Sequence, residues 1–263
     1  MVFPRFDVFN RTDPEIMASP SGEIRSAFIL GSTSEVAKSL CRELAHRGCV
    51  RFHLLARDEA MNQRFAEELR SYKNVSVSCA ALDLFRDADL HCDVALELDH
   101  FDLYLIAAGS LGDADLARCD VQESLKITAA NYTGLLRWIT AIATPERLLS
   151  QGRLWVFSSV AADRGRPSNY HYGAAKAALT ALCEGLLLRC QGHPFAVRII
   201  KAGYMATPMT LGKAPAALCV SPESVARNLL RNPNRRGLEY LPWWWSAVMR
   251  VVRYLPAPLA AKL

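Results

Sequence analysis

The stretch FSSVAADRGRPSNYHYGAAKAAL, residues 157–179, decides both the fold class and the chemistry expected of this chain. It begins where an apolar run over residues 154–157 ends, and such a run is typical of a buried strand. Ser159 closes that strand, Tyr172 follows it by thirteen residues, and Lys176 follows the tyrosine by four. The tyrosine and the lysine open an alanine- and leucine-rich segment, which predicts a helix.

Tyr172 and Lys176 are one helical turn apart, so they share one helix face. The pKa of a free tyrosine is about 10, which is too high for efficient proton exchange at neutral pH. The Lys176 ammonium favours the phenolate and is expected to lower the pKa of Tyr172. The pair therefore predicts a general acid/base, and the Ser159 hydroxyl is placed to polarise a carbonyl group.

A tyrosine and a lysine at this spacing also occur by chance in many helices. Here they follow a strand that ends in two serines, and they open an alanine-rich helix. These three features together favour the catalytic interpretation over a coincidence.

The arrangement resembles the active site of the short-chain dehydrogenase/reductases. The resemblance implies an α/β fold, a single-domain Rossmann-type doubly wound parallel sheet with helices on both faces. Alternating strand and helix patterns and a length of 263 residues agree with one such domain. It also implies a catalytic set of Asn131, Ser159, Tyr172 and Lys176. In the family the asparagine kinks its helix and holds a water that relays protons to the lysine.

The first cofactor element is expected after the apolar run 27–30, where a turn leads into an amphipathic helix. Such a turn directs backbone N–H groups at a pyrophosphate. Only Gly31 of the three family glycines is present, because Glu35 and Ala37 replace the others. Ser32 and Glu35 match a capping box, in which the carboxylate folds back onto a backbone N–H. Alone, this segment would be interpreted as an ordinary capped turn. The cofactor-binding residues predicted here are Gly31, Ser32, Thr33, Ser34, Glu35 and Val36.

Arg57 closes the next predicted strand, and the first acid, Asp58, comes one residue later. In dinucleotide folds an acid at the strand end binds the ribose 2′-OH, whereas an arginine accommodates a 2′-phosphate. The sequence therefore favours NADPH over NADH; the alternative is a solvated loop arginine. Further strands are predicted over residues 51–56, 75–82, 102–107 and 196–200. By resemblance, the other cofactor-binding residues are Asp83, Leu84, Ala108, Gly109, Tyr172, Lys176, Gly203 and Thr207.

The regions outside this pattern divide the chain into three parts. Residues 1–25 lack periodicity and predict a flexible extension without signal-peptide character, 26–240 form the reductase domain, and 241–263 form a separate segment.

The eight cysteines show no C-x-x-C pair or metal-ligand spacing, so we expect reduced thiols, no metal and a cytoplasmic protein. No nucleic-acid module is recognisable. Residues 208–220 predict a small, apolar substrate lid.

The C-terminal segment is basic and aromatic. Residues 224–263 hold seven Lys and Arg and one acid, so they contribute +6 to a net charge of +5, and the rest contributes −1. Trp243, Trp244 and Trp245 precede an apolar run that contains Arg250 and Arg253. The run is too short and too charged to span a bilayer, but it suits a membrane surface. A dimer contact and a substrate lid are the alternatives.

Short motifs at residues 31–35, 111–113 and 131–133 and this basic tail resemble the decaprenylphosphoryl-2-keto-ribose reductases. The resemblance implies a polyprenyl-linked sugar as the lipophilic carbonyl substrate, a flavin-dependent oxidase as partner and a role in cell-envelope synthesis. It also implies a homodimer or homotetramer, formed through the helices that carry Asn131 and Tyr172, and a place at the inner face of the membrane. Two alternatives are reduction of another lipophilic ketone, or oxidation of the alcohol, and a non-catalytic dinucleotide sensor.

Overall fold

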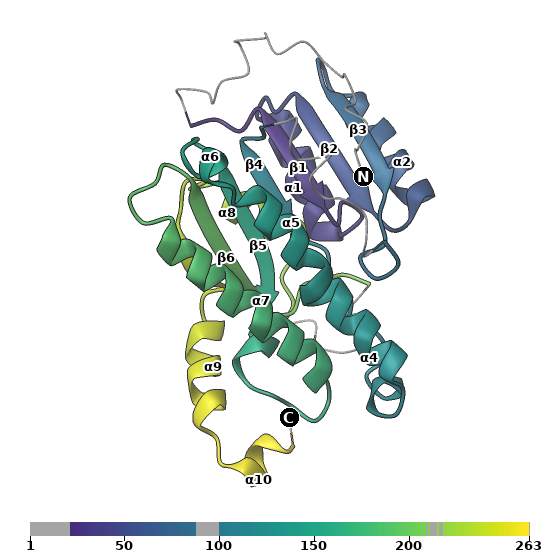
Figure 1. Cartoon of the computed structure of the whole chain (residues 1–263), viewed down its shortest axis with the longest axis vertical. Coiled ribbons are helices and arrows are strands. Elements are labelled where there is room, and N and C mark those ends of the chain that lie inside the picture. The colour runs from purple at the N-terminus through teal and green to yellow at the C-terminus, as the bar shows by residue number, and fades with distance from the viewer. Residues whose placement is uncertain (1–21, 88–99, 209, 211–214, 216–217, 263) are drawn as a thin grey trace, which may run out of the picture.

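The computed structural model of the chain describes residues 22–87, 100–208, 210, 215 and 218–262. Their centre is a seven-stranded sheet with the order β3-β2-β1-β4-β5-β6-β7, in which every neighbouring pair is parallel (Figure 1). This is the predicted single-domain doubly wound fold. The strands are β1 (Ser26–Leu30), β2 (Arg51–Ala56), β3 (Ser76–Ala81), β4 (Leu103–Ile106), β5 (Arg153–Ser159), β6 (Ala196–Ala202) and β7 (Gly237–Leu241).

Helices cover both faces of the sheet, as Figure 1 shows. In β1, Ala27 and Ile29 pack into one core with α1, α2 and α8, whereas Phe28 and Leu30 pack into a second core with α5 and α7. All five residues of this strand are buried because both faces are covered. The helices are α1 (Glu35–His46), α2 (Glu59–Arg70), α4 (Val121–Thr128), α5 (Gly134–Ile142), α6 (Pro145–Leu148), α7 (Tyr170–Arg189) and α8 (Pro222–Leu229).

Three short segments interrupt this pattern. A 3-10 turn, η2 (Leu116–Arg118), precedes α4, and a π-helical turn, η3 (Ala129–Thr133), joins α4 to α5. A second 3-10 turn, η4 (Val160–Asp163), directly follows β5. The π-helical turn contains Asn131, so the predicted irregularity of that helix is confirmed.

Strand β7 was not predicted from the sequence, because it contains a glutamate. Glu239 is buried in β7, and its Oε1 accepts a hydrogen bond of 2.5 Å from Nε of Arg198 on β6. Arg198 also donates to the carbonyl of Leu229, 2.8 Å away. A buried ion pair with further hydrogen bonds can occupy a strand that sequence patterns would read as polar.

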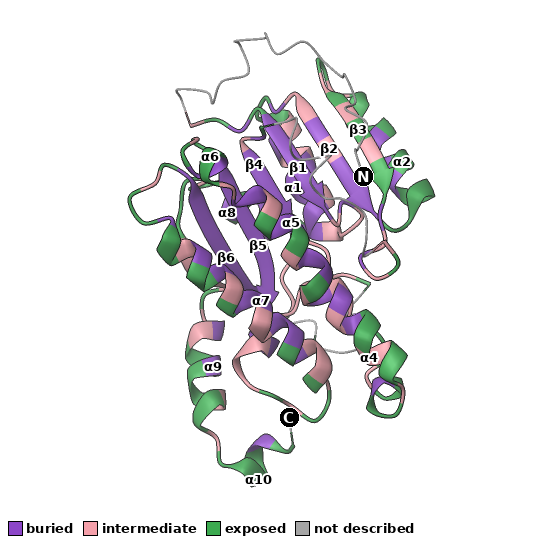
Figure 2. Cartoon of the chain, viewed as in Figure 1, coloured by how far each residue is buried: buried purple, intermediate pink, exposed green. Residues whose placement is uncertain are grey.

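The C-terminal arm, residues 242–262, extends beyond the carboxyl ends of β5 and β6. It contains α9 (Trp245–Tyr254) and α10 (Ala257–Ala260), and Figure 2 shows that much of its surface is exposed. In the part of the chain that is described, no helix is both long enough and apolar enough to cross a bilayer.

The edges of two predicted segments differ from expectation. Ile24 is buried and the backbone N–H of Arg25 donates to Asp102, so the packed domain begins before residue 26. Residues 1–21 of the predicted extension lie outside the described residues. Most of the predicted lid over residues 208–220 also lies outside them, at 209, 211–214 and 216–217.

Candidate active site

The four predicted catalytic residues come from three elements that meet at the carboxyl edge of the sheet. Ser159 ends β5, Asn131 lies in η3, and Tyr172 and Lys176 lie in the first two turns of α7. Gly109, just beyond β4, is their common neighbour. A Cβ atom on Gly109 would lie 2.8 Å from Oδ1 of Asn131 and 3.2 Å from Nζ of Lys176, so only glycine leaves room for both.

Lys176 is a buried cation, since only 3% of its surface is exposed. Its Nζ donates to the carbonyl of Phe157 on β5 at 2.9 Å. Burial lowers the pKa of Lys176 to about 8. Its backbone carbonyl accepts a hydrogen bond from Thr180, whose hydroxyl lies 2.7 Å from that of Ser158. The first of the two serines thus joins α7 to β5, which leaves Ser159 for the site.

Asn131 is completely buried. Its Nδ2 donates to the carbonyl oxygens of Ser110, at 2.6 Å, and Ile127, at 2.8 Å, and its Oδ1 accepts from the Ser110 N–H at 3.3 Å. The side chain therefore replaces a backbone donor within its own helix and ties the loop after β4 to that helix. This accounts for the π-helical geometry, because the side chain occupies a carbonyl that a regular helix would use.

Tyr172 has a pKa above its ordinary value, because burial disfavours the phenolate. A hydrogen bond with Ser159 and the positive charge of Arg166 act in the opposite direction but do not cancel the effect of burial. The prediction that Lys176 lowers the pKa of Tyr172 is therefore wrong. The ammonium is held by Phe157 and lies 5.9 Å from the centre of the tyrosine ring.

Arg166 is a functional candidate that the sequence analysis missed. It lies in the loop between Ser159 and Tyr172, and its charge acts on the tyrosine. Its Nε is buried and has no hydrogen-bond partner among the described residues. The side-chain oxygen Oδ1 of Asn169, three residues later, is also buried and has no hydrogen-bond partner among the described residues. The sequence signal that could have indicated Arg166 is its position, as a positively charged residue, between Ser159 and Tyr172.

The turn after β1 has the geometry of a phosphate-binding turn. Gly31 has a φ of +91°, and a Cβ atom there would lie 2.4 Å from the backbone nitrogen of Ala108. No other residue fits this close approach of two strand ends. The helix α1 starts at Glu35, so the free N–H groups of its first turn face the same edge of the sheet. These features fit a dinucleotide pyrophosphate.

Two predicted details of this turn are wrong. Ser32 is buried and its hydroxyl donates to Oδ1 of Asn62 at 2.6 Å, so it is not available to a phosphate. Nor does Glu35 form a capping box, because Ser34 is the N-cap residue and Glu35 pairs with Lys38, 2.6 Å away. The ion pair neutralises the carboxylate that replaces the family glycine. A bound phosphate would therefore meet little repulsion from it.

The other residues predicted to bind the cofactor near this turn differ in how far their side chains are exposed. Thr33 and Ser34 are partly exposed, and Val36 is buried in the core, so Val36 could offer only its backbone N–H. Arg57 is exposed at the end of β2. The neighbouring acid, Asp58, is the N-cap of α2 and accepts from the Met61 N–H at 2.8 Å, which occupies one of its carboxylate oxygens.

The remaining predicted cofactor residues lie at strand ends along the same edge. Asp83 Oδ1 accepts from the N–H groups of Phe85 and Arg86, which leaves its second oxygen for other contacts. Leu84 is buried next to Gly134. Other residues at this edge are Ala108 beside Gly31, Gly203 after β6, and Thr207, which contacts Thr210. In the described residues, no group of three or more His, Cys, Asp or Glu side chains could hold a metal ion.

Comparison with known proteins agrees with this geometry. The family model described as short chain dehydrogenase matches residues 25–216. An uncharacterised oxidoreductase of Mycobacterium tuberculosis is 31% identical over 232 residues, which cover 87% of this chain and 92% of that protein. One of Streptomyces coelicolor is 29% identical, over 92% of this chain and 97% of its own length. The chain belongs to the short-chain dehydrogenase family and is an NAD(P)-dependent dehydrogenase or reductase, which argues against a non-catalytic sensor.

Solved structures share the fold. A short-chain dehydrogenase from Sphingobium yanoikuyae in complex with NADPH has a TM-score of 0.75 and 22% identity, and the match covers 91% of this chain and 99% of that one. An alcohol dehydrogenase from Thermococcus sibiricus complexed with 5-hydroxy-NADP has a TM-score of 0.68 and 21% identity, with coverage of 83% and 96%. At these identities the likeness establishes the fold.

The position of Arg166 gives a prediction about pH. Arg166→Gln removes a positive charge that lowers the pKa of Tyr172, so that pKa should rise further. Reduction needs the protonated phenol, so the fall of kcat/KM at alkaline pH should move to higher pH by a fraction of a unit. Arg227→Gln, on α8 at the other face of the sheet, is the control. A profile identical to wild type would remove Arg166 from the surroundings of Tyr172.

Proposed function

We propose that the protein is an NADPH-dependent reductase of a lipophilic ketone. The substrate we propose is the keto group of a polyprenyl-phosphate-linked sugar, as in the decaprenylphosphoryl-2-keto-ribose reductases, within cell-envelope glycan synthesis. The observation that carries the proposal is the contact between the catalytic edge of the sheet and an aromatic, basic arm. Trp245 of that arm packs against Gly203 and Val160, one residue beyond β6 and one beyond Ser159 respectively.

The four catalytic residues support the following division of work. The nicotinamide, when bound, supplies a hydride to the carbonyl carbon. The Ser159 hydroxyl donates a hydrogen bond to the carbonyl oxygen, and Tyr172 gives that oxygen its proton. Burial keeps the pKa of Tyr172 above its ordinary value, so the phenol is protonated at neutral pH and has a proton to give, but it is a weaker acid than a free tyrosine.

Lys176 and Asn131 would then resupply the proton that Tyr172 has given up. The Lys176 ammonium is next to Gly109 and is a suitable donor to ribose hydroxyls. Its pKa of about 8 lets it give up and regain a proton close to neutral pH. Asn131 holds the loop after β4 and, as the family resemblance implies, would anchor the water that returns protons to the lysine.

The preference for NADPH is supported by the residues after β2. Arg57 is exposed, whereas Asp58, the acid that could bind a ribose 2′-OH, is engaged as a helix cap. A guanidinium at this place suits a 2′-phosphate. The ion pair between Glu35 and Lys38 lowers the repulsion of the pyrophosphate for either cofactor, so the preference depends on Arg57.

A phosphate-linked substrate is supported by Arg166. Its buried Nε has no partner in the described part of the chain, and its charge acts on Tyr172. A buried guanidinium donor near the reacting carbonyl would be satisfied by a phosphodiester oxygen attached to the sugar. A simple lipid ketone would leave that donor unpaired.

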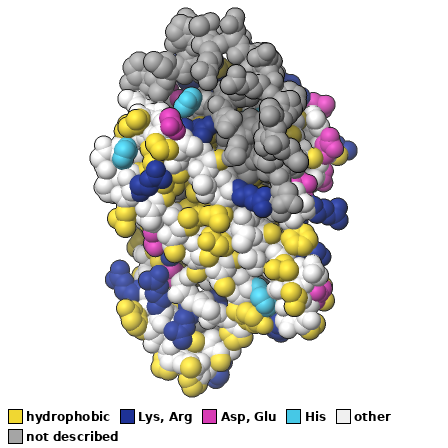
Figure 3. All heavy atoms as spheres, in the orientation of Figure 1, with side chains coloured by type: hydrophobic (Ala, Val, Ile, Leu, Met, Phe, Trp, Pro, Cys, Tyr) yellow, Lys and Arg dark blue, Asp and Glu magenta, His cyan; other side chains and the backbone are white. Residues whose placement is uncertain are grey.

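The outer face of the arm supports peripheral contact with the inner membrane face. Trp243 is 76% exposed, Tyr254 84% and Val251 65%, and Arg250 is exposed beside them. Figure 3 shows hydrophobic and basic side chains mixed at the end of the molecule where Figure 1 places α9 and α10. Aromatic rings at headgroup depth and arginines near anionic lipid are typical of interfacial helices.

The proposed partners follow from the same assignment. A flavin-dependent oxidase would produce the ketone. A homodimer or homotetramer would form through the helices that carry Asn131 and Tyr172, which are the continuous segment α4-η3-α5 and α7. Exposed apolar side chains on α4 and α7 favour association. These are Val121, Leu125 and Leu188.

A direct test of the function is NADPH oxidation by the purified full chain with a polyprenyl-phosphate-linked 2-keto pentose in detergent. We expect turnover, and we expect Tyr172→Phe to reduce kcat by on the order of a thousandfold, because the proton donor is lost. The variant should still bind NADPH. Turnover of a 3-oxoacyl thioester but not of the sugar would replace the proposed substrate, and an active Tyr172→Phe would remove the proposed acid.

The cofactor preference can be tested at Arg57. Arg57→Asp should weaken NADPH binding by on the order of a hundredfold, because a carboxylate would face the 2′-phosphate, and NADH should become the better cofactor. The ratio of kcat/KM for the two cofactors measures this. Arg231→Asp, an exposed site after α8, makes the same charge change elsewhere. An unchanged ratio would mean that another residue binds the 2′-phosphate.

The membrane contact can be tested by flotation with vesicles that contain phosphatidylglycerol. The full chain should float with the vesicles. A variant with Trp243→Ser, Val251→Ser and Tyr254→Ser should remain at the bottom, because the exposed apolar face is lost. Leu149→Ser removes one equally exposed side chain outside the arm and should float. Equal flotation of all three proteins would exclude this face as the contact.

A further inference from the structure

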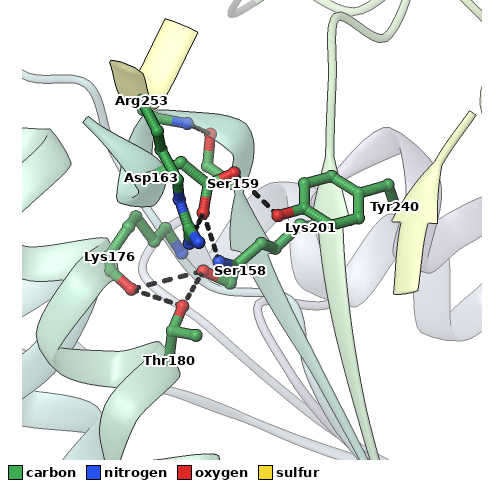
Figure 4. A network of polar contacts seen from close by, with 9 residues as sticks. Ser158, Ser159, Asp163, Lys176, Thr180, Lys201, Tyr240 and Arg253 are labelled. Atoms are coloured by element: carbon green, nitrogen blue, oxygen red, sulfur yellow. Dashed lines mark hydrogen bonds and ion pairs between the residues drawn. The ribbon is translucent and has the colours of Figure 1, made fainter. Parts of the chain in front are cut away.

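A buried carboxylate lies four residues after Ser159. Asp163 is the last residue of η4, and its side chain is fully buried. Its Oδ1 accepts hydrogen bonds from Nζ of Lys201 and, at 2.8 Å, from Nη2 of Arg253, and its Oδ2 accepts from the hydroxyl of Tyr240 at 2.9 Å. Figure 4 shows these side chains converging on Asp163 from β6, β7 and α9. Both carboxylate oxygens are therefore occupied.

The cluster depends on the negative charge of Asp163. The Lys201 side chain is 3% exposed, and a buried ammonium without a counter-charge is strongly unfavourable. Tyr240 remains a donor, because burial and the Asp163 carboxylate raise its pKa to about 12. The Arg253 side chain, by contrast, is half exposed, so solvent can take over its charge if the contact is lost. Lys201 and Tyr240 fix the carboxylate in place, and Arg253 is its removable partner.

The turn that ends in Asp163 also holds the catalytic serine. The Ser159 hydroxyl accepts a hydrogen bond from the Ala161 N–H at 3.1 Å. The carbonyl of Ala161 lies 3.0 Å from the position a Cβ would take on Gly173, the residue after Tyr172. The turn therefore contacts Ser159 at its start, α7 in its middle and the ion cluster at its end. A shift of its end would change how the serine faces the tyrosine.

The C-terminal arm is attached to this turn at several points. Besides the Arg253–Asp163 ion pair, Nη1 of Arg164 donates to the carbonyl of Arg253 at 2.7 Å. Trp245 packs with Val160, the first residue of the turn. The arm is therefore bound to both ends of η4.

We infer that Asp163 is a positioning residue which, through its ion pair with Arg253, couples the seating of the C-terminal arm to the placement of Ser159 against Tyr172. The arm is thus part of the catalytic unit as well as a surface element. Asp163 itself does not act on the substrate. The inference rests on the dehydrogenase chemistry and does not depend on the sugar substrate proposed above.

The first test compares two arginines of the same helix in the full chain. Arg253→Gln should speed hydrogen–deuterium exchange of the η4 amides, including that of Ala161, because the turn loses one anchor. Arg250→Gln, which changes an exposed arginine of the same helix three residues earlier, should leave this exchange unchanged. The measurement needs no substrate. Unchanged exchange in Arg253→Gln, or equal acceleration in both variants, would overturn the inference.

The second test measures turnover with the ketosugar or, as a generic carbonyl compound, phenanthrenequinone, at saturating NADPH. Arg253→Gln should lower kcat by on the order of tenfold, because small displacements of catalytic groups are costly, while the Kd for NADPH stays the same. Arg253→Lys, which keeps a cation, should recover part of the loss. A wild-type kcat in Arg253→Gln, or a loss confined to NADPH affinity, would contradict the proposed coupling.

Asp163 needs a compensated variant, because Asp163→Asn alone leaves the Lys201 ammonium buried and unpaired. The double variant Asp163→Asn with Lys201→Met removes both charges and keeps an acceptor for Tyr240. It should fold and lose kcat as Arg253→Gln does. Adding Arg253→Gln to it should cause no further loss, because the same contact is already absent. Additive losses would mean that Arg253 and Asp163 act separately.

Discussion

The arrangement of this active site depends on burying one ammonium group. Lys176 lies between the end of β5, the loop at Gly109 and Asn131, and its pKa falls from 10.5 in water to about 8. That difference corresponds to about 3 kcal/mol of folding free energy. The cost is fully present below pH 8, where the lysine is charged in both states, and it disappears as the pH rises through 10.5. The ammonium donates a hydrogen bond to the carbonyl of Phe157, which holds it in this place.

The neighbours of Lys176 are shaped by this requirement. Gly109 leaves the space that the ammonium and the Asn131 amide need. Asn131 lies in a π-helical turn, and its side chain holds the loop after β4 through Ser110. The same burial raises the pKa of Tyr172, so the phenol keeps its proton. In the proposed function, the tyrosine gives its proton to the ketone and the labile proton of the lysine replaces it. The positive charge of Arg166 lowers the pKa of Tyr172 but does not cancel the effect of burial.

The C-terminal arm has one side packed on the protein and another side exposed to solvent. Its inner residues, Trp245 and Met249, are buried against the end of the sheet, whereas Trp243 and Tyr254 project outward. A helix with one face in the protein core and an apolar face in solvent needs an environment for the second face. In the proposed function that environment is the membrane that holds the substrate. The Asp163 cluster then links the two faces.

The sequence alone determined six of the seven strands, because apolar strand runs are local signals. The Tyr172–Lys176 spacing after a strand that ends in Ser159 is also local, and the family resemblance completed the proposed catalytic set with Asn131. The sequence alone misjudged Ser32 and made no prediction for Glu239 and Asp163, because the partners of these side chains are distant in the chain. Ser32 bonds Asn62, Glu239 enters a strand by pairing with Arg198, and Asp163 meets three elements that follow it. The direction of the Tyr172 pKa was also decided by the tertiary structure, since spacing places a charge nearby but only packing sets the desolvation that outweighs it.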